Sequence, residues 1–188
     1  MKNIAIFASG NGSNFEAIAK AIASGYIPAK LVLLVVNKKD AYVIQRAKQY
    51  GIETYILSLK DCLNKIEYEQ KIVYQLKERK VDLICLAGYM LYCGKTLLEA
   101  YSNQIINIHP ALLPSFKGAH GIEDAYTYGV KVFGVTVHYV DDGIDSGKII
   151  DQAAFHKNDE SLEEIENKIH ELEHELYPRV IKKLVEGV

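Results

Sequence analysis

The sequence predicts an α/β fold, a single Rossmann-like domain over residues 1–188 with a mostly parallel central sheet, helices on both faces and an antiparallel C-terminal section. Three observations lead to this prediction. Short apolar, β-branched runs alternate with longer segments of helical period, which is typical of βαβ units. The runs in the first part of the chain are apolar on both faces, as buried parallel strands are. The last two runs are separated only by a short loop, which favours an antiparallel pair.

In the first hundred residues, periodicity and glycine positions predict the elements. The helical segments Asn14–Ser24 and Ala41–Tyr50 are each followed by a glycine, which tolerates the left-handed conformation past a helix end. A short strand follows at Glu53–Ile56. Asp61–Lys80 has an apolar stripe at helical spacing and is expected to pack on one side of the sheet. The expected central strands of the whole chain are Ile4–Phe7, Leu31–Val36, Val81–Leu86 and Ile105–Ile108.

After Ile108 the pattern becomes irregular. Two prolines and two glycines interrupt both periods, which predicts a long functional loop (Pro110, Pro114, Gly118, Gly121). Two half-exposed strands follow, Val132–Val140 and Lys148–Phe155, joined by a loop.

The last element is expected to be a long helix. Ser161 and Glu164 have the spacing of a capping box, in which each side chain satisfies a backbone amide at the helix start. The helix is expected to run to about Val185, with a kink at Pro178.

Charge and composition exclude several classes of protein. The formal net charge is −2 and the pI is about 6.3, so no basic field is available to hold a nucleic acid. No stretch approaches the roughly 20 apolar residues that span a bilayer. Three cysteines without a CxxC pair favour a reducing compartment. We therefore expect a cytoplasmic protein, monomeric or homodimeric, without nucleic-acid or membrane partners.

The segment Ser9–Asn14, with sequence Ser-Gly-Asn-Gly-Ser-Asn, predicts an anion site. It joins the first strand to the first helix, where free backbone amides and the positive end of a helix dipole point at one place. A phosphate is expected there, and Ser13 or Asn14 can add side-chain hydrogen bonds. The loop matches neither the dinucleotide nor the P-loop motif, which favours a small phosphorylated metabolite. The alternative is a plain tight turn before a capped helix.

Asn107 and His109 lie at the carboxyl end of a central strand, where ligands bind in open α/β sheets. Their two-residue spacing on an extended chain puts both on the same side. An imidazolium and an amide NH₂ together can stabilise a developing oxyanion. Asp145, in the loop Asp141–Gly147, is a candidate to keep His109 protonated and oriented. That loop could instead bind calcium, but it lacks the EF-hand order.

A second pattern resembles a zinc-binding motif. His170-Glu171-Leu172-Glu173-His174 matches HExxH on the expected last helix. No further histidine follows it, and the acidic candidates for a third ligand are few. In a helix this rich in Glu and Lys, chance explains the match better, and we predict no metal site.

In their order and spacing, the Gly-Asn-Gly-Ser-Asn loop, Asn-Ile-His-Pro-Ala-Leu-Leu-Pro (107–114) and the loop around Asp145 resemble the phosphoribosylglycinamide formyltransferase family, from Ile4 to Pro178. The Asn-x-His-Pro motif is shared with other folate formyltransferases, whereas the glycine loop is more specific. The resemblance implies one formyltransferase domain, in which residues 1–100 form a phosphate-binding half and residues 101–188 a catalytic half.

The resemblance also implies roles for particular residues. The catalytic set is Asn107, His109 and Asp145, and the expected substrate contacts are Gly12, Ser13, Asn14, His170 and Glu173. The expected folate contacts are Lys65, Met90, Leu91, Tyr92, Cys93, Asn107, Asp141, Asp142, Gly143, Ile144 and Asp145. The family commonly has arginine where this chain has Leu91, and often where it has Lys65, so folate affinity is expected to differ. His138 could line the pocket or pack in the core, and we favour packing.

The resemblance thus implies transfer of a formyl group from 10-formyltetrahydrofolate to the amine of glycinamide ribonucleotide, in purine biosynthesis. The expected route is direct attack through an oxyanion between Asn107 and His109, without metal or covalent enzyme intermediate. Three alternatives stay open at this point. They are a formyltransferase of another amine, such as a nucleotide sugar or an aminoacyl-tRNA, a non-catalytic phosphate-binding module, and an HExxH zinc hydrolase.

Overall fold

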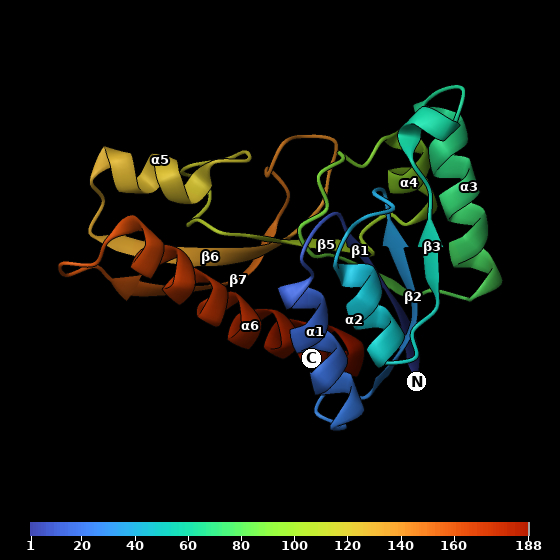
Figure 1. The fold of residues 1–188 in the computed structure, drawn as a ribbon, viewed down its shortest axis with the longest axis horizontal. Helices are drawn as coiled ribbons and strands as arrows, with labels where there is room; N and C mark the ends of the chain where they lie inside the picture. Colours follow the sequence, from blue (N-terminus) through green and yellow to red (C-terminus); the bar gives the residue numbers. More distant parts are fainter. Residues whose placement is uncertain (188) are drawn as a thin grey trace.

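The apolar runs form one mixed sheet in the computed structural model, which describes residues 1–187 (Figure 1). Across the sheet the strand order is β3-β2-β1-β4-β5-β6-β7. The strands are β1 (Lys2–Ala8), β2 (Ala29–Val36), β3 (Thr54–Ile56), β4 (Leu83–Leu86), β5 (Ile105–His109), β6 (Val132–Tyr139) and β7 (Ile149–His156).

The first five strands pair in parallel, whereas β5 with β6 and β6 with β7 pair antiparallel. The predicted fold class is therefore confirmed. The chain first builds outward from β1 through β2 to β3, and then returns to place β4 and β5 on the other side of β1. The strand order thus reverses between β1 and β4. In open α/β sheets this reversal opens a crevice at the carboxyl ends of the strands.

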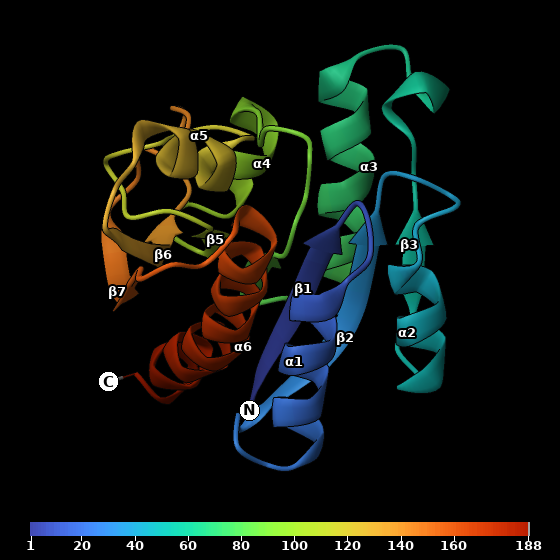
Figure 2. The same cartoon turned by 60° about the vertical axis from the view of Figure 1, so that its left-hand side comes forward.

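Helices cover both faces of the sheet (Figure 2). The buried residues of α1, α2, α5 and α6 belong to one apolar cluster, and those of α3 and α4 belong to the other. The helices are α1 (Ser13–Ala23), α2 (Val43–Gln49), α3 (Lys65–Glu78), α4 (Lys95–Ala100), α5 (Gly121–Tyr128) and α6 (Leu162–Glu186), with a 3₁₀ turn at Leu59–Asp61. None of the helices within residues 1–187 is long and apolar enough to cross a membrane.

Strand β1 is apolar on both faces because helices cover it on both sides. Ile4 and Ile6 belong to the cluster under α1 and α6, whereas Ala5 and Phe7 belong to the cluster under α3, and all four are fully buried. Burying a side chain such as Phe7 or Ile6 contributes roughly 1.5–3 kcal/mol. The strand that carries the first loop of the site is therefore fixed from both sides.

Two short helices differ from the sequence prediction. The segment after β5 contains α5, which begins at Gly121 within the expected irregular loop. Gly121 is required by close packing, because a Cβ there would lie 2.9 Å from the carbonyl oxygen of Phe116 and 3.2 Å from Nε2 of His109. Helix α4 was not expected either. Its first turn is capped by Glu69, which lies 25 residues earlier, so no local signal marks it.

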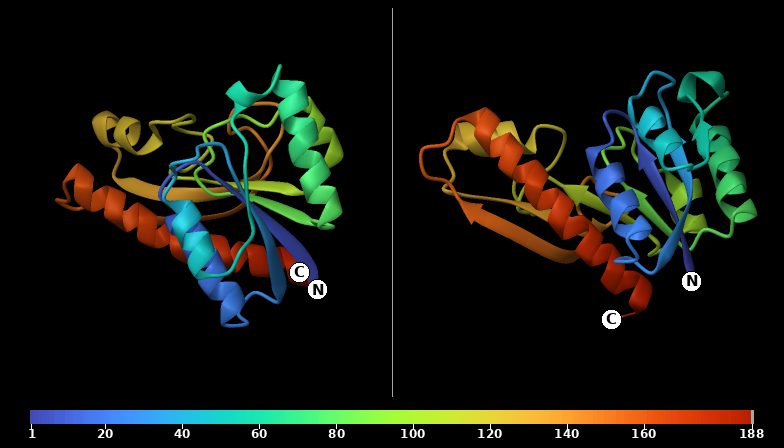
Figure 3. Two further views of the ribbon diagram at one scale, coloured as in Figure 1. Left: turned by 45° about the vertical axis from the view of Figure 1, so that its right-hand side comes forward. Right: turned by 60° about the horizontal axis from the view of Figure 1, so that its bottom comes forward.

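Helix α3 begins at Lys65, four residues later than expected, because the Asn64 side chain accepts the amide of Glu67. The predicted capping box of Ser161 and Glu164 is present at the start of α6. Pro178 does not interrupt α6, which continues to Glu186 as one helix (Figure 3).

Helix α6 lies alongside α1, β6 and β7, and one buried residue ties it to the middle of the sheet. The hydroxyl of Tyr177 is 2.8 Å from the carbonyl oxygen of Leu86 in β4 and 3.2 Å from that of Ile106 in β5. Glu173 lies one turn before Tyr177 on the same face of the helix. The anchor therefore sets where Glu173 stands above the strand ends.

Candidate active site

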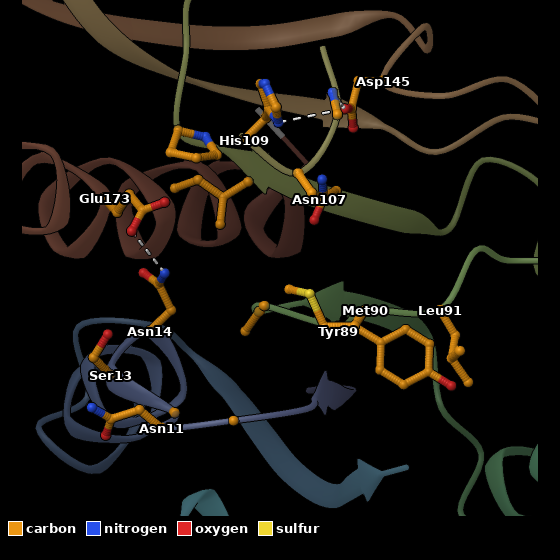
Figure 4. A pocket seen from close by; sticks show the side chains of 18 of the residues that line it. Asn11, Ser13, Asn14, Tyr89, Met90, Leu91, Asn107, His109, Asp145 and Glu173 are labelled. Carbon is orange, nitrogen blue, oxygen red and sulfur yellow. Dashed lines mark hydrogen bonds and ion pairs between the residues drawn. The ribbon is translucent and has the colours of Figure 1, made fainter. Parts of the chain in front are cut away.

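A cavity of about 440 Å³ lies at the carboxyl ends of β1, β4 and β5, where the strand order reverses (Figure 4). Its size suits a small metabolite. Its walls come from the loop after β1, the loop after β4, the end of β5, residues 118–119 and 144–145, and α6. The predicted site residues that line it are Gly12, Ser13, Asn14, Met90, Leu91, Tyr92, Asn107, His109, Ile144, Asp145, His170 and Glu173.

The loop after β1 is held open by Gly12, which adopts a left-handed conformation with φ of 80° at the start of α1. A Cβ on Gly12 would lie 2.4 Å from Cγ2 and 3.1 Å from Cα of Val43, so no side chain fits. The first helical hydrogen bond joins the amide of Glu16 to the carbonyl of Gly12, and no side chain caps the helix start. The amides of the first turn are therefore available to an anion in the cavity.

Two neighbouring elements brace this loop. From α2, Arg46 donates hydrogen bonds to the backbone oxygen and to Oδ1 of Asn11, at 2.9 and 2.7 Å. From α6, Oε2 of Glu173 accepts from Nδ2 of Asn14 at 3.2 Å (Figure 4) and is 3.0 Å from Nδ1 of His170. Glu173 is nearly fully buried. The carboxylate thus joins the last helix to the first turn of α1, directly after the loop.

His109 and Asp145 lie next to each other in the wall of the cavity. Nδ1 of His109 is 3.5 Å from Oδ2 of Asp145 (Figure 4), and its Nε2 is 2.7 Å from the carbonyl oxygen of Phe116. Both ring nitrogens face acceptors, so a ring protonated on both nitrogens donates to both. His109 is only 4 % exposed.

Asp145 is itself fixed by the backbone. Its Oδ2 accepts the amide of Gly118 at 2.8 Å, and its backbone has a left-handed φ of 46°. Among residues with a side chain, Asp and Asn tolerate this region best. The loop containing Asp145 is therefore tied to the loop after β5.

His138 lies within this cluster, which corrects its interpretation as a packing residue. It pairs directly with Asn107 across β5 and β6, and Nδ2 of Asn107 is 3.3 Å from its Nε2. Its Nδ1 is 2.9 Å from the carbonyl oxygen of Tyr139. Burial lowers the pKa of His138 below its ordinary value. In the neutral ring Nδ1 donates to the carbonyl, and Nε2 accepts from the Asn107 amide.

The segment that follows His109 is held by a buried hydroxyl. Oγ1 of Thr136 donates to the carbonyl oxygen of Ala111 at 2.7 Å and accepts the amide of Leu113 at 3.1 Å. Because Thr136 pairs with His109 across the two strands, the same strand that supplies His138 also fixes the exit of the chain from the site.

A second cavity of about 330 Å³ adjoins the first. The two share a wall made of Tyr89, Leu91, Tyr92, Asn107, Ile144 and Asp145. Among the predicted folate contacts, the second cavity is lined by Leu91, Tyr92, Cys93, Asn107, Asp141, Asp142, Gly143, Ile144 and Asp145. Lys65 lines neither cavity, and its Nζ donates instead to the carbonyl oxygen of Tyr92.

The two histidines of the HExxH pattern lie in different surroundings. His170 lines the first cavity and is bonded to Glu173, whereas His174 does not line it. Within residues 1–187, no group of three or more His, Cys, Asp and Glu side chains is arranged to hold a metal ion.

Comparison with known proteins identifies the family. Residues 2–181 match the family model described as formyl transferase. The chain belongs to the formyl transferase family. The Asn107, His109 and Asp145 cluster is therefore the candidate site of a formyl transferase.

Close relatives make the family assignment more specific. The chain is 50 % identical over 186 residues to a phosphoribosylglycinamide formyltransferase of Bacillus subtilis (strain 168), covering 98 % of this chain and 95 % of that protein. It is 39 % identical to the enzyme of the same name from Haemophilus influenzae, covering 100 % and 89 %. The crystal structure of glycinamide ribonucleotide transformylase 1 from Geobacillus kaustophilus matches with a TM-score of 0.95 and 47 % identity, covering 98 % of each chain. The predicted family and enzyme class are confirmed.

Sequence reasoning missed the polar neighbours that hold the formyl transferase site. His138, the Phe116 carbonyl and the Gly118 amide each contact a member of the predicted catalytic set. For His138 a signal existed, since Thr136 and His138 alternate with the apolar Val135 and Val137 on the strand that follows the one ending in His109. The two backbone groups carry no sequence signal at all.

We predict that Gly12→Ala destabilises the protein. The left-handed φ alone costs an alanine about 1–2 kcal/mol, and the contact with Val43 adds to it. Gly10→Ala is the matched control, because nothing lies within 4 Å of a Cβ at that position, and it should change stability by less than about 1 kcal/mol. Urea unfolding of both variants measures the difference. Equal effects would contradict the role given to Gly12.

We predict that three histidines titrate in opposite directions. Burial lowers the pKa of His138 and of His174 below 6.5, whereas the hydrogen bond that His170 donates to Glu173 raises the pKa of His170. Folded His138 binds fewer protons than unfolded His138 just below pH 6.5, so its contribution to stability is lost as the pH falls through that range. NMR titration, assigned with single His→Gln variants, measures each midpoint. A midpoint above 6.5 for His138 would be inconsistent with its burial as a neutral ring.

Proposed function

We propose that the protein transfers the formyl group of 10-formyltetrahydrofolate to the amine of glycinamide ribonucleotide. The observation that carries the proposal is the wall shared by the two cavities, which includes Asn107 and Asp145. A group transfer between two substrates needs the reacting atoms to meet at one place, held by the same residues. A cavity for each substrate, joined at these side chains, provides such a place.

The first cavity suits the acceptor substrate. At one end the free amides at the start of α1 suit a phosphate, and at the other end lie Asn107, His109 and Asp145. Between them, Glu173 offers a carboxylate to the hydroxyl groups of a sugar. The relatives from Bacillus subtilis and Haemophilus influenzae are named for phosphoribosylglycinamide, which combines a phosphate, a ribose and an amine.

The second cavity suits the formyl donor. Leu91, Cys93 and Val140 give it apolar walls, and the loop from Asp141 to Asp145 adds polar groups at its edge. Burial raises the pKa of the Cys93 thiol to about 12, so Cys93 stays neutral and contributes apolar surface. The flat, partly polar ring system of a folate requires this combination of surfaces.

In the proposed mechanism, the neutral amine attacks the formyl carbon and the carbonyl oxygen becomes a tetrahedral oxyanion. Asn107 and His109 stabilise the oxyanion as hydrogen-bond donors. Because Nε2 of His109 faces the Phe116 carbonyl, that bond is exchanged for the oxyanion when the substrate binds. Asp145 stabilises the protonated ring and accepts the proton lost by the amine, while His109 gives its proton to the folate nitrogen as the carbon–nitrogen bond to the donor breaks. A proton shift from Asp145 to His109 then restores the pair.

The test of the proposed function is a steady-state assay with glycinamide ribonucleotide and 10-formyltetrahydrofolate. The expected result is release of tetrahydrofolate together with formylated ribonucleotide. A nucleotide sugar and an aminoacyl-tRNA serve as competing acceptors. Turnover with one of these, and none with glycinamide ribonucleotide, would contradict the proposal while leaving the family assignment intact.

We predict that Asn107→Asp lowers kcat by roughly 10²–10³-fold, because an acceptor replaces a donor beside the developing oxyanion. Both KM values should change far less, since the side chain keeps its size. Asn103→Asp is the control, because Asn103 is exposed and lines neither cavity. A kcat that stays near the wild-type value would remove Asn107 from the proposed mechanism.

A further inference from the structure

Side chains of helix α3 contact one wall of the second cavity, which the proposed function assigns to the formyl donor. The wall segment Met90–Cys93 supplies Leu91, Tyr92 and Cys93 to the second cavity. Side chains of α3 contact this segment and the residue before it, while Met90 and Tyr92 are themselves exposed. The hydroxyl of Tyr68 bonds to that of Tyr89, just before the wall segment, and Nζ of Lys65 donates to the carbonyl of Tyr92.

Glu69, on the same helix, is the one charged side chain of this support that is almost completely buried, with 2 % of its side chain exposed. Its Oε1 accepts the amide of Gly94, directly after the wall segment, and its Oε2 accepts the amide of Leu97 at 3.1 Å. Nζ of Lys65 lies 3.6 Å from Oε1. A buried carboxylate is thus paired with one cation and two amides, as its burial requires.

The fit around this carboxylate leaves no room for another side chain. A Cβ on Gly94 would lie 2.9 Å from both oxygens of Glu69. At the other end of the wall segment, the amide of Met90 donates to Oγ of Ser9 at 2.9 Å. The wall is therefore fixed at both ends, by Ser9 toward the loop after β1 and by Glu69 toward α4.

We infer that Glu69 is a positioning residue for the formyl donor, because it holds the Met90–Cys93 wall of the donor cavity through the amides at the start of α4. Lys65 acts with it, by joining the carboxylate to the Tyr92 carbonyl. The inference rests on the proposed function, since it assigns the second cavity to the folate. Glu69 lines neither cavity, and Cys93, the wall residue next to Gly94, lines only the second cavity, so we expect the effect of Glu69 to be larger on the donor than on the acceptor substrate.

The test compares two glutamates of the same helix. Glu69→Gln keeps the shape of the side chain but offers one amide donor where two backbone amides need acceptors. Glu67→Gln is the matched control, because Glu67 also accepts a backbone amide, that of Leu63, and pairs with Lys71, but on the exposed face. Kinetics of the full chain give kcat and the KM for each substrate.

Glu69→Gln should raise the donor KM about tenfold, the size expected for loss of a hydrogen bond to a charged group. Its KM for glycinamide ribonucleotide should stay within about twofold of the wild-type value, and Glu67→Gln should leave both KM values unchanged. An unchanged donor KM, or an equal rise in both, would overturn the inference. A wild-type protein without turnover would instead contradict the proposed function.

Two further variants keep the test decisive. If Glu69→Gln does not fold, Gly94→Ala displaces the carboxylate while keeping its charge, and the same donor-specific rise is expected. Lys65→Met separates positioning from direct contact. If Lys65 positions the wall, the Lys65→Met variant should show the same rise in KM for the intact folate donor as for a folate donor that lacks the glutamate tail. A rise confined to the intact donor would assign Lys65 to the ligand and remove it from the support.

Discussion

The reversal of strand order between β1 and β4 is the constraint on which the site depends. Because the chain builds away from β1 in one direction and returns on the other side, the loops after these two strands separate above the sheet. Ser9 joins the bases of the two loops, since it donates to the carbonyl of Gly88 and accepts the amide of Met90. Beyond this contact the loop after β1 lines the first cavity at the start of α1, and the loop after β4 lines both cavities.

At the wall shared by the two cavities, the polar side chains are linked by a chain of buried contacts. Asp145 faces His109 through one oxygen and His138 through the other, at 3.5 and 3.7 Å, while the Gly118 amide fixes its orientation. His138 in turn faces the amide of Asn107. Removal of one member would leave a buried donor or acceptor unpaired, which costs more than the bond itself contributes. The site is therefore one unit rather than three independent side chains.

The sequence predicted the parts of the molecule that depend on local pattern. The strands, the glycine loop before α1, the capping box of α6 and the strand-end position of Asn107 and His109 all follow from periodicity and spacing. It did not predict contacts between distant segments, such as the cap that Glu69 gives to α4. Gly121 was interpreted as a break, although it begins α5, because its closeness to the Phe116 carbonyl is visible only in three dimensions. For His138 the alternation of its strand indicated the face on which it lies, but its neighbour Asn107 is set by the strand register.

The left-handed backbone conformation of Asp145 restricts which residue types fit at this position. The conformation admits Gly, Asn and Asp at low cost, and a carboxylate is what the His109 ring, when protonated, and the Gly118 amide require of the side chain. Glutamate has the charge but not the backbone preference, and asparagine has the backbone preference but not the charge. Among the twenty amino acids aspartate combines both properties, so stereochemistry and charge together restrict the residue that fits at this position.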